Sequence, residues 1–211
     1  MINREKKFVF IHIPKTGGQS VENIFGFHEG QEYNDKLRST EWGMGWCHEN
    51  KYWRGHMTIN QYLTNDLLTE EESNSFFKFS FVRNPWARAV SEWRWRFRLI
   101  PIRFNVFLKD KWAILDNYPS EGAFKQHNRS QHIFIYDDDD KLLVDFVGKL
   151  ENIESDWKIV ADRIGVSDKL PHINKSKQNK HYTEYYTTEL RDLIARRYEK
   201  DIELFGYKFS D

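Results

Sequence analysis

The chain has 211 residues, 30% of them charged and 39% hydrophobic, and its 32 basic residues are balanced by 32 acidic ones. A chain of this length is expected to form one compact domain that buries roughly 70% of its unfolded surface, so folding needs neither disulfides nor a metal. The single cysteine, Cys47, excludes an intrachain disulfide framework, and the zero net charge argues against a protein that coats nucleic acid or another polyanion.

Apolar runs near the start of the chain are short. The run from Phe8 to Ile13 falls far short of the ~20 residues of a membrane helix, and it is shorter than the ~7–15 residues of a signal-peptide core. The histidines show no HxxxH or HExxH spacing. We therefore expect a cytoplasmic protein without membrane insertion, with one domain over residues 1–211 and no metal.

The first predicted unit is a strand, a loop and a helix. Residues 8–13 are aromatic and β-branched, as in a buried strand, and Pro14 and a glycine pair end the run. A helix follows over residues 20–25, where the apolar side chains recur at helical spacing. Residues 29–54 look irregular, and residues 58–68 are a further candidate helix.

The second unit repeats this pattern. Residues 76–82 form an aromatic strand, and a helix runs from Trp86 to about Leu99 with Pro85 near its first position. Two strand–loop–helix units in one domain favour a parallel α/β sheet.

The rest of the chain is predicted mainly from apolar spacing. Residues 101–126 are interpreted as mostly helical, and the runs 133–136 and 142–147 as a hairpin or consecutive sheet elements around the Asp137–Asp140 turn. Helices are predicted over 153–164, ending at Gly165, and over 188–205, ending at Gly206.

Residues 12–20, HIPKTGGQS, have the composition of an anion-binding loop. A loop that leaves a strand and opens a helix presents backbone N–H groups to an anion, and glycines let the backbone approach closely. Lys15 adds a mobile charge, and Thr16 and Ser20 add hydroxyl donors. This is not a Walker A loop, because the lysine precedes the glycines. The alternative is a tight turn with an exposed lysine.

Residues 81–91, FVRNPWARAVS, form the second motif. Arg83 at the strand end and Ser91 two helical turns later are placed to converge on one phosphate, with Arg88 one turn before Ser91. The alternative is a helix start that carries scattered surface arginines.

The two motifs in this order resemble the PAPS-dependent sulfotransferases, in particular the Golgi-type carbohydrate enzymes that include heparan sulfate 2-O-sulfotransferase. PAPS is 3′-phosphoadenosine-5′-phosphosulfate. The likeness continues through residues 143–157, 170–176 and 198–207. Unlike the Golgi enzymes, which carry a membrane anchor and disulfides, this chain is expected to be soluble.

The resemblance implies a P-loop-like three-layer α/β fold, with a central parallel sheet flanked by helices. It implies transfer of the sulfuryl group from PAPS to a hydroxyl of an acceptor, and a carbohydrate is the expected acceptor. Lys15 would be catalytic and bind the 5′-phosphosulfate, while Arg83 and Ser91 would bind the 3′-phosphate. The remaining loop residues implied to bind the nucleotide are Thr16, Gly17, Gly18, Gln19 and Ser20.

The resemblance also implies a histidine as general base. The Gly55-His56 pair lies between the two motifs, at a position similar to that of the catalytic histidine in the 2-O-sulfotransferases. A histidine near pKa 6.5 suits proton removal at neutral pH. His48, Glu49 and Glu92 are the alternative bases.

Two other functions stay open: a P-loop kinase or NTPase, and a non-catalytic module that binds PAP, the desulfated donor, or glycans. The kinase hypothesis is weakened by the inverted order of lysine and glycine. For the acceptor, the segment from Trp93 to Arg98 alternates aromatic and arginine side chains, which suit either a sugar surface or anchors in the core.

Overall fold

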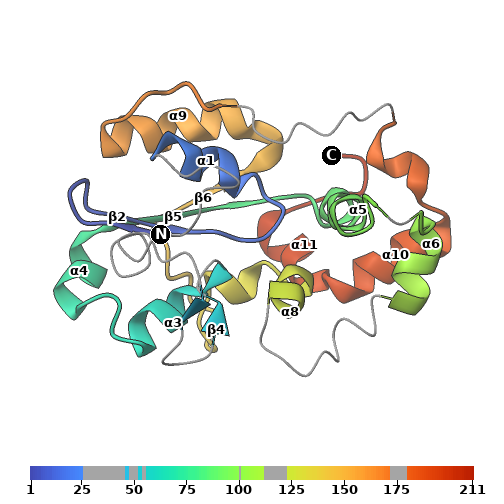
Figure 1. The fold of residues 1–211 in the computed structure, drawn as a ribbon, viewed down its shortest axis with the longest axis horizontal. Helices are drawn as coiled ribbons and strands as arrows, with labels where there is room; N and C mark the ends of the chain where they lie inside the picture. The colour runs from blue at the N-terminus through green and yellow to red at the C-terminus, as the bar shows by residue number, and fades with distance from the viewer. Residues whose placement is uncertain (26–45, 48–51, 54–55, 100, 112–122, 172–179) are drawn as a thin grey trace.

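The computed structural model describes residues 1–25, 46–47, 52–53, 56–99, 101–111, 123–171 and 180–211 (Figure 1). Its centre is an open four-stranded sheet in the order β1-β2-β5-β6. Strands β2, β5 and β6 run parallel, and the short edge strand β1 pairs antiparallel with β2. The bounds are β1 Ile2–Asn3, β2 Phe8–Ile11, β5 Phe77–Val82 and β6 Phe146–Lys149.

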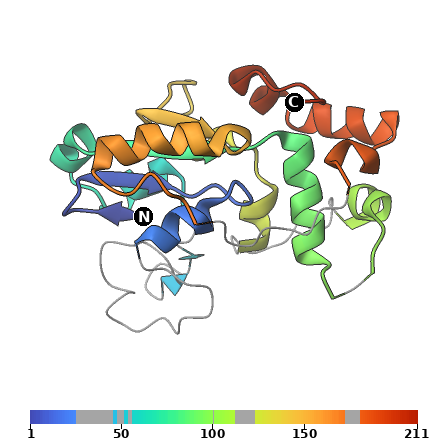
Figure 2. The same cartoon turned by 90° about the horizontal axis from the view of Figure 1, so that it is seen from above.

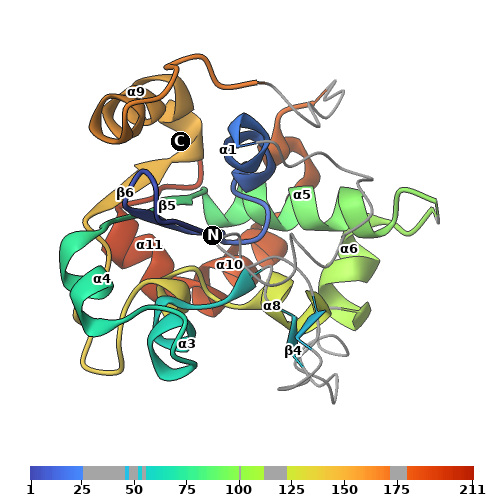
Figure 3. The same cartoon turned by 60° about the vertical axis from the view of Figure 1, so that its left-hand side comes forward.

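Helices cover both faces of the sheet. Helices α1 and α9 lie over one face, whereas α3, α4 and α8 lie on the opposite side (Figures 1 and 3). Helices α5, α6 and α10 gather beyond one end of the sheet (Figure 2). The bounds are α1 Gly18–Ile24, α3 Ile59–Thr64, α4 Glu70–Ser75, α5 Pro85–Arg96, α6 Phe104–Val106, α8 Ala123–Asn128, α9 Ile153–Ile164, α10 Thr188–Arg197 and α11 Glu199–Phe205.

Shorter elements complete the described chain. A two-stranded antiparallel ribbon is formed by β3 Trp46–Cys47 and β4 Tyr52–Trp53. A π-helical turn and several 3₁₀ turns connect the larger elements or precede them. Those turns are η2 Phe107–Lys111 (π), η3 His132–Phe134, η4 Leu150–Asn152 and η5 Tyr182–Tyr185.

The side chains of β2 explain the layered arrangement. Phe8 and Phe10 point to the α1 and α9 side, where they pack with Phe79 of β5 and Trp157 of α9. Val9 and Ile11 point to the other side and join the cluster that contains Ile59 of α3. A strand buried on both faces reads as a continuous apolar run, which is why the sequence predicts it so clearly.

Polar residues fix where the helices begin. The side chain of Asn84 accepts hydrogen bonds from the backbone N–H groups of Trp86 and Ala87, and Pro85 occupies the first turn of α5. Thr58 and Gln61 form a capping box at the start of α3. Strand β5 and helix α5 are therefore joined by a rigid turn that contains Arg83.

Several predicted elements are confirmed. The fold is mixed α/β, with helices on both sides of the sheet. Strands β2 and β5 lie within their predicted runs, and α5 begins at Pro85 as expected. Helix α9 ends at Gly165, whose φ of 66° suits a glycine cap. None of the described helices is long and apolar enough to cross a membrane.

Other elements differ from the prediction. The predicted helix over 188–205 is two helices, because Tyr198 leaves the helical conformation and its buried hydroxyl donates to the carbonyl of Asn128. The run 133–136 forms no strand: η3, which ends at Phe134, takes up its first half, and Asp201 binds the backbone N–H and the ring of His132. Of the expected hairpin or consecutive sheet elements, the structure has a single antiparallel bridge, Tyr136 to Leu142, and strand β6, which begins at Phe146 within the second run.

Candidate active site

The loop between β2 and α1 turns sharply and leaves the start of the helix open. Lys15 and Gly17 have positive φ angles of 70° and 85°, and α1 begins at Gly18 with no side-chain cap. The hydroxyl of Thr16 donates to the carbonyl of Ile13 at 2.8 Å, so this side chain braces the turn. The N-cap residue is Gly17, so no side chain of the cap residue covers this end of the helix, and a helix start of this kind suits an anion.

Gly18 is required by close packing against a histidine. A Cβ atom at this position would lie 2.2 Å from Cδ2 and 2.4 Å from Nε2 of His12. No real side chain tolerates such a contact without movement of the ring. The sequence suggested that the glycine pair gives the backbone access to an anion; the structure adds that Gly18 makes room for His12.

The ammonium group of Lys15 lies 4.9 Å from the ring centroid of Trp95 on α5. Among the described residues it has no carboxylate within ion-pair distance. Burial lowers the pKa of Lys15 to about 8; Glu92 opposes this shift, while Arg83, Arg88 and Arg96 add to it. A partly buried cation in a positive surrounding gains most from an added anion.

Two arginines hold the loop from the α5 side. The guanidinium of Arg83 donates to the carbonyl of Lys15 at 3.3 Å, and burial lowers its pKa. Arg88 is fully engaged: it donates to the carbonyls of Pro14, His127 and Arg129 at 3.0, 3.0 and 2.8 Å. Arg88 is therefore a structural clamp between the loop and the end of α8, not a free surface charge.

Three other residues that the sequence predicts to bind the nucleotide lie on α1 and α5. Ser20 is buried in α1, and Gln19 is exposed beside it. Ser91 is half-buried on α5, and its hydroxyl forms no hydrogen bond with a described residue. The structure brings Arg83 directly to the loop.

Three histidines meet beside the loop. The ring of His56 makes edge contacts with His12 at 4.7 Å and with His127 at 5.0 Å between centroids. Its Nδ1 lies 3.0 Å from the carbonyl oxygen of His12. Because a carbonyl only accepts, Nδ1 must carry the hydrogen, and Nε2 keeps its lone pair. Burial lowers the pKa of His56 well below its usual value, and the two neighbouring histidines reinforce the shift.

The flanking histidines are each held by a buried carboxylate. Nδ1 of His12 lies 2.7 Å from Glu22, and Nδ1 of His127 lies 2.8 Å from Glu92. Glu92 also binds Arg96 at 2.5 Å. Burial opposes the ionisation of Glu92, but His127 and Arg96 outweigh it and lower the pKa to about 2. Glu92 is thus poorly suited to be the alternative base; His48 and Glu49 lie outside the described residues.

Sequence reasoning missed two residues of this site, Trp95 and His127. Trp95 is 38% exposed, and the ammonium group of Lys15 lies over its indole ring. The same indole stacks on the ring of His127, with 4.8 Å between the ring centroids. Trp93, by contrast, is an anchor: its indole N–H donates to the carbonyl of Ile102. The aromatic–arginine alternation on α5 marks the right helix turn, but only tertiary packing shows which tryptophan faces the loop.

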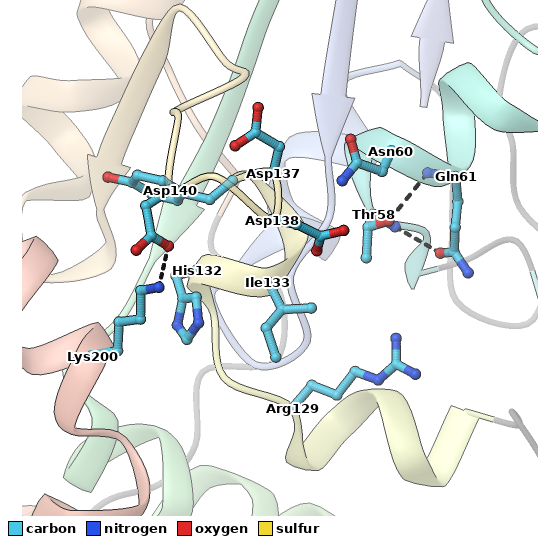
Figure 4. Close-up of a pocket in the computed structure, with 11 residues that line it drawn as sticks. Thr58, Asn60, Gln61, Arg129, His132, Ile133, Asp137, Asp138, Asp140 and Lys200 are labelled. Atoms are coloured by element: carbon cyan, nitrogen blue, oxygen red, sulfur yellow. Dashed lines mark hydrogen bonds and ion pairs between the residues drawn. The ribbon is translucent and has the colours of Figure 1, made fainter.

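A separate polar pocket of about 400 Å³ lies between α3, η3 and the Asp137–Asp140 turn (Figure 4). Its charged groups are largely tied to one another or to the backbone. Lys200 binds Asp140, and Asp137 accepts from the backbone N–H groups of Asp139 and Lys141. The candidate nucleotide ligands are not among the residues that line it. Nowhere in the described ranges do three or more His, Cys, Asp or Glu side chains form a group suited to a metal ion.

Comparison with known proteins agrees with the two motifs. The chain is similar to an uncharacterized protein of Archaeoglobus fulgidus, with 31% identity over 102 residues that make up 46% of this chain and 74% of that protein. The sequence profile of the Sulfotransferase family matches residues 1–208. Since this match spans nearly the whole chain, the protein belongs to the sulfotransferase family and is a PAPS-dependent enzyme.

Proposed function

We propose that this enzyme binds PAPS at the loop between β2 and α1 and transfers its sulfuryl group to a carbohydrate hydroxyl, with His56 as general base. The observation that carries this proposal is the ammonium of Lys15. It lies partly buried against Trp95, and no described carboxylate pairs with it. Arg83 donates to the backbone carbonyl of Lys15, and α1 begins three residues later with a glycine as its N-cap. A cation in this position suits a bound anion.

The donor set fits the two phosphate ends of PAPS. Lys15 and the amides of Thr16, Gly17 and Gly18 would hold the 5′-phosphosulfate, with Gln19 and Ser20 at the start of α1 beside them. Arg83 and Ser91 would hold the 3′-phosphate, and Arg83 still has guanidinium N–H groups beyond the one that binds Lys15. The bound donor supplies a sulfuryl group whose bond to the 5′-phosphate breaks as the bond to the acceptor oxygen forms.

Lys15 stabilises the negative charge that develops on the leaving phosphate. A positioned charge of this kind, together with in-line alignment, is the main contribution of a protein to phosphoryl transfer, and we extend it to sulfuryl transfer. Glu92 contributes a negative charge near Lys15, and Arg83, Arg88 and Arg96 contribute three positive ones, so the surroundings of the loop favour a bound anion.

His56 removes the proton of the acceptor hydroxyl through Nε2. Its Nδ1–H is tied to the carbonyl of His12, the residue at the end of β2 that leads into the loop. The base and the loop are therefore anchored to the same strand end. General base catalysis of this kind contributes roughly 10²–10⁴ in rate.

A carbohydrate acceptor is supported by the resemblance to carbohydrate sulfotransferases and by Trp95. Its partly exposed indole lies next to Lys15 and His127, and an indole face is a suitable surface for a sugar ring. Family membership favours sulfuryl transfer over the kinase or NTPase alternative.

The test is a comparison of thermal stabilisation by PAP and by ATP with magnesium. PAP at ~100 times its Kd adds about 2.7 kcal/mol, or roughly 5–10 °C for a chain of this size. We expect this shift with PAP and its loss in Lys15→Met. Stabilisation by ATP with magnesium and not by PAP contradicts the proposed site. His56→Gln should lower turnover at least ~100-fold while PAP binding stays within about twofold; turnover near that of the wild type would exclude His56 as the base.

A further inference from the structure

The three histidines of the site have unequal partners. His12 and His127 each direct Nδ1–H at a buried carboxylate, Glu22 at 2.7 Å and Glu92 at 2.8 Å. His56 directs its Nδ1–H at a neutral backbone carbonyl. A carboxylate stabilises the imidazolium form far more than a carbonyl does. Glu92 therefore favours a proton on His127, whereas the Nδ1–H of His56 meets only a neutral carbonyl.

The distances make the three rings interact. The centroid of His56 lies 4.7 Å from that of His12 and 5.0 Å from that of His127. Two like charges about 5 Å apart repel by the equivalent of at least about 0.5 pH unit, even with the screening of bulk water. Once an outer histidine, His12 or His127, is protonated, His56 accepts a proton only at a lower pH.

The other charged groups around His56 either lower its pKa further or are paired with another side chain. Arg88, from α5, adds a positive charge. Glu22 of α1 and Glu92 of α5 each bind an outer histidine, and Glu92 also binds Arg96. Burial lowers the pKa of His127, and Lys15 adds to this shift, whereas the carboxylate of Glu92 opposes it. Burial, the outer histidines and Arg88 together lower the pKa of His56.

We propose that His127, held by Glu92, is a positioning residue that takes up a proton before His56 does and so leaves Nε2 of His56 free to act as base, while His12, held by Glu22, packs against the other side of the ring. This inference rests on the proposed role of His56. It gives the buried carboxylate of Glu92 a role, because this carboxylate favours a proton on His127 over one on His56. The proposed base then stays active at a pH at which an isolated histidine is already protonated.

The experiment is an NMR titration of the whole protein labelled with ¹³C at histidine Cε1, with each signal assigned by its loss in a histidine-to-glutamine variant. We expect His127 to titrate at higher pH than His56 in the wild type. In His127→Gln the midpoint of His56 should rise by at least about 0.5 pH unit. The inference is overturned if His56 is protonated first, or if its midpoint is unchanged in His127→Gln.

A matched control is available in the same molecule. His132 binds the buried carboxylate of Asp201 at 2.7 Å, the same chemistry as the outer pairs, but it lies at the polar pocket and makes no ring contact with the cluster among the described residues (Figure 4). His132→Gln should leave the midpoint of His56 unchanged. Glu92→Gln is a second variant: it should lower the midpoint of His127 itself, and no change there contradicts the role of Glu92.

The titration needs no donor, acceptor or turnover, so it separates this inference from the proposed function. If His56→Gln retains turnover while the order of protonation is as expected, the assignment of the base is wrong and the order of protonation stands. If His56→Gln loses turnover while His56 titrates first, the base is right and the role of His127 is wrong.

Discussion

The affinity for PAP should depend on the charge of Lys15, and this dependence has a predictable shape. Burial lowers the pKa of Lys15 to about 8 from the usual 10.5. A bound phosphate raises that pKa again, because it favours the charged lysine. The free protein must therefore gain a proton on binding whenever the pH is above about 8, and affinity falls as the pH rises.

The magnitude follows from the fraction of Lys15 that is charged in the free protein. With a pKa of about 8, that fraction falls from about three quarters at pH 7.5 to about one tenth at pH 9. If the bound lysine stays charged throughout, the Kd of PAP should rise about eightfold over this interval. The phosphates of PAP contribute little here, because their last ionisation lies near pH 6.

Isothermal titration calorimetry at pH 7.5, 8, 8.5 and 9 measures this dependence. Lys15→Met should bind PAP more weakly at every pH, with a Kd that no longer varies. Lys15→Arg keeps its charge over the whole range and should also give a flat profile. A flat profile in the wild type, or the same rise in Lys15→Met, refutes the assignment of Lys15 to the donor phosphate.

Three further predictions concern stability and the loop. Because the pKa of Lys15 is lower in the folded protein, its charge destabilises the donor-free protein below about pH 8, and this destabilisation disappears as the pH rises towards 10.5. Lys15→Met should therefore raise Tm at pH 7 by a few degrees, for a gain on the order of 1–3 kcal/mol. An unchanged or lower Tm in a calorimetric scan contradicts this expectation. Gly18→Ala should lower the free energy of unfolding in urea by about 1–3 kcal/mol and weaken PAP binding, because the new methyl group displaces His12. The control is Gly165→Ala, at a positive φ with open space around it, which should lower the free energy of unfolding by about 1 kcal/mol without changing the affinity for PAP. Arg88→Met should cost about 3 kcal/mol or more, since three buried carbonyls lose their donor, and a cost below about 1 kcal/mol would falsify its role as a clamp.

The parts of the fold that sequence predicts well are those fixed by neighbouring residues. Strand β2 is apolar on both faces, and Pro85 with Asn84 marks the start of α5 whatever lies around it. Both determine local conformation directly. The two motifs, the loop and the β5–α5 turn, can therefore be located from the order of residues alone.

The rest of the site depends on residues distant in sequence. Glu92 pairs with His127, which lies 35 positions further along the chain. Lys15 of the first strand–loop–helix unit contacts Trp95 near the end of the second. No periodicity or spacing reports such contacts. The same limit applies to Arg88, which the sequence placed near a phosphate and the structure assigns to three backbone carbonyls.

A crystal structure of the protein with PAP gives the most direct test of the proposed site. We expect the 5′-phosphate within hydrogen-bond distance, ~2.7–3.2 Å, of Nζ of Lys15 and of the amides at the start of α1, and the 3′-phosphate at the guanidinium of Arg83. Lys15 should then have left the face of Trp95. PAP bound elsewhere, for example in the polar pocket between Asn60 and Lys200, with Lys15 still on Trp95, would contradict the proposed site.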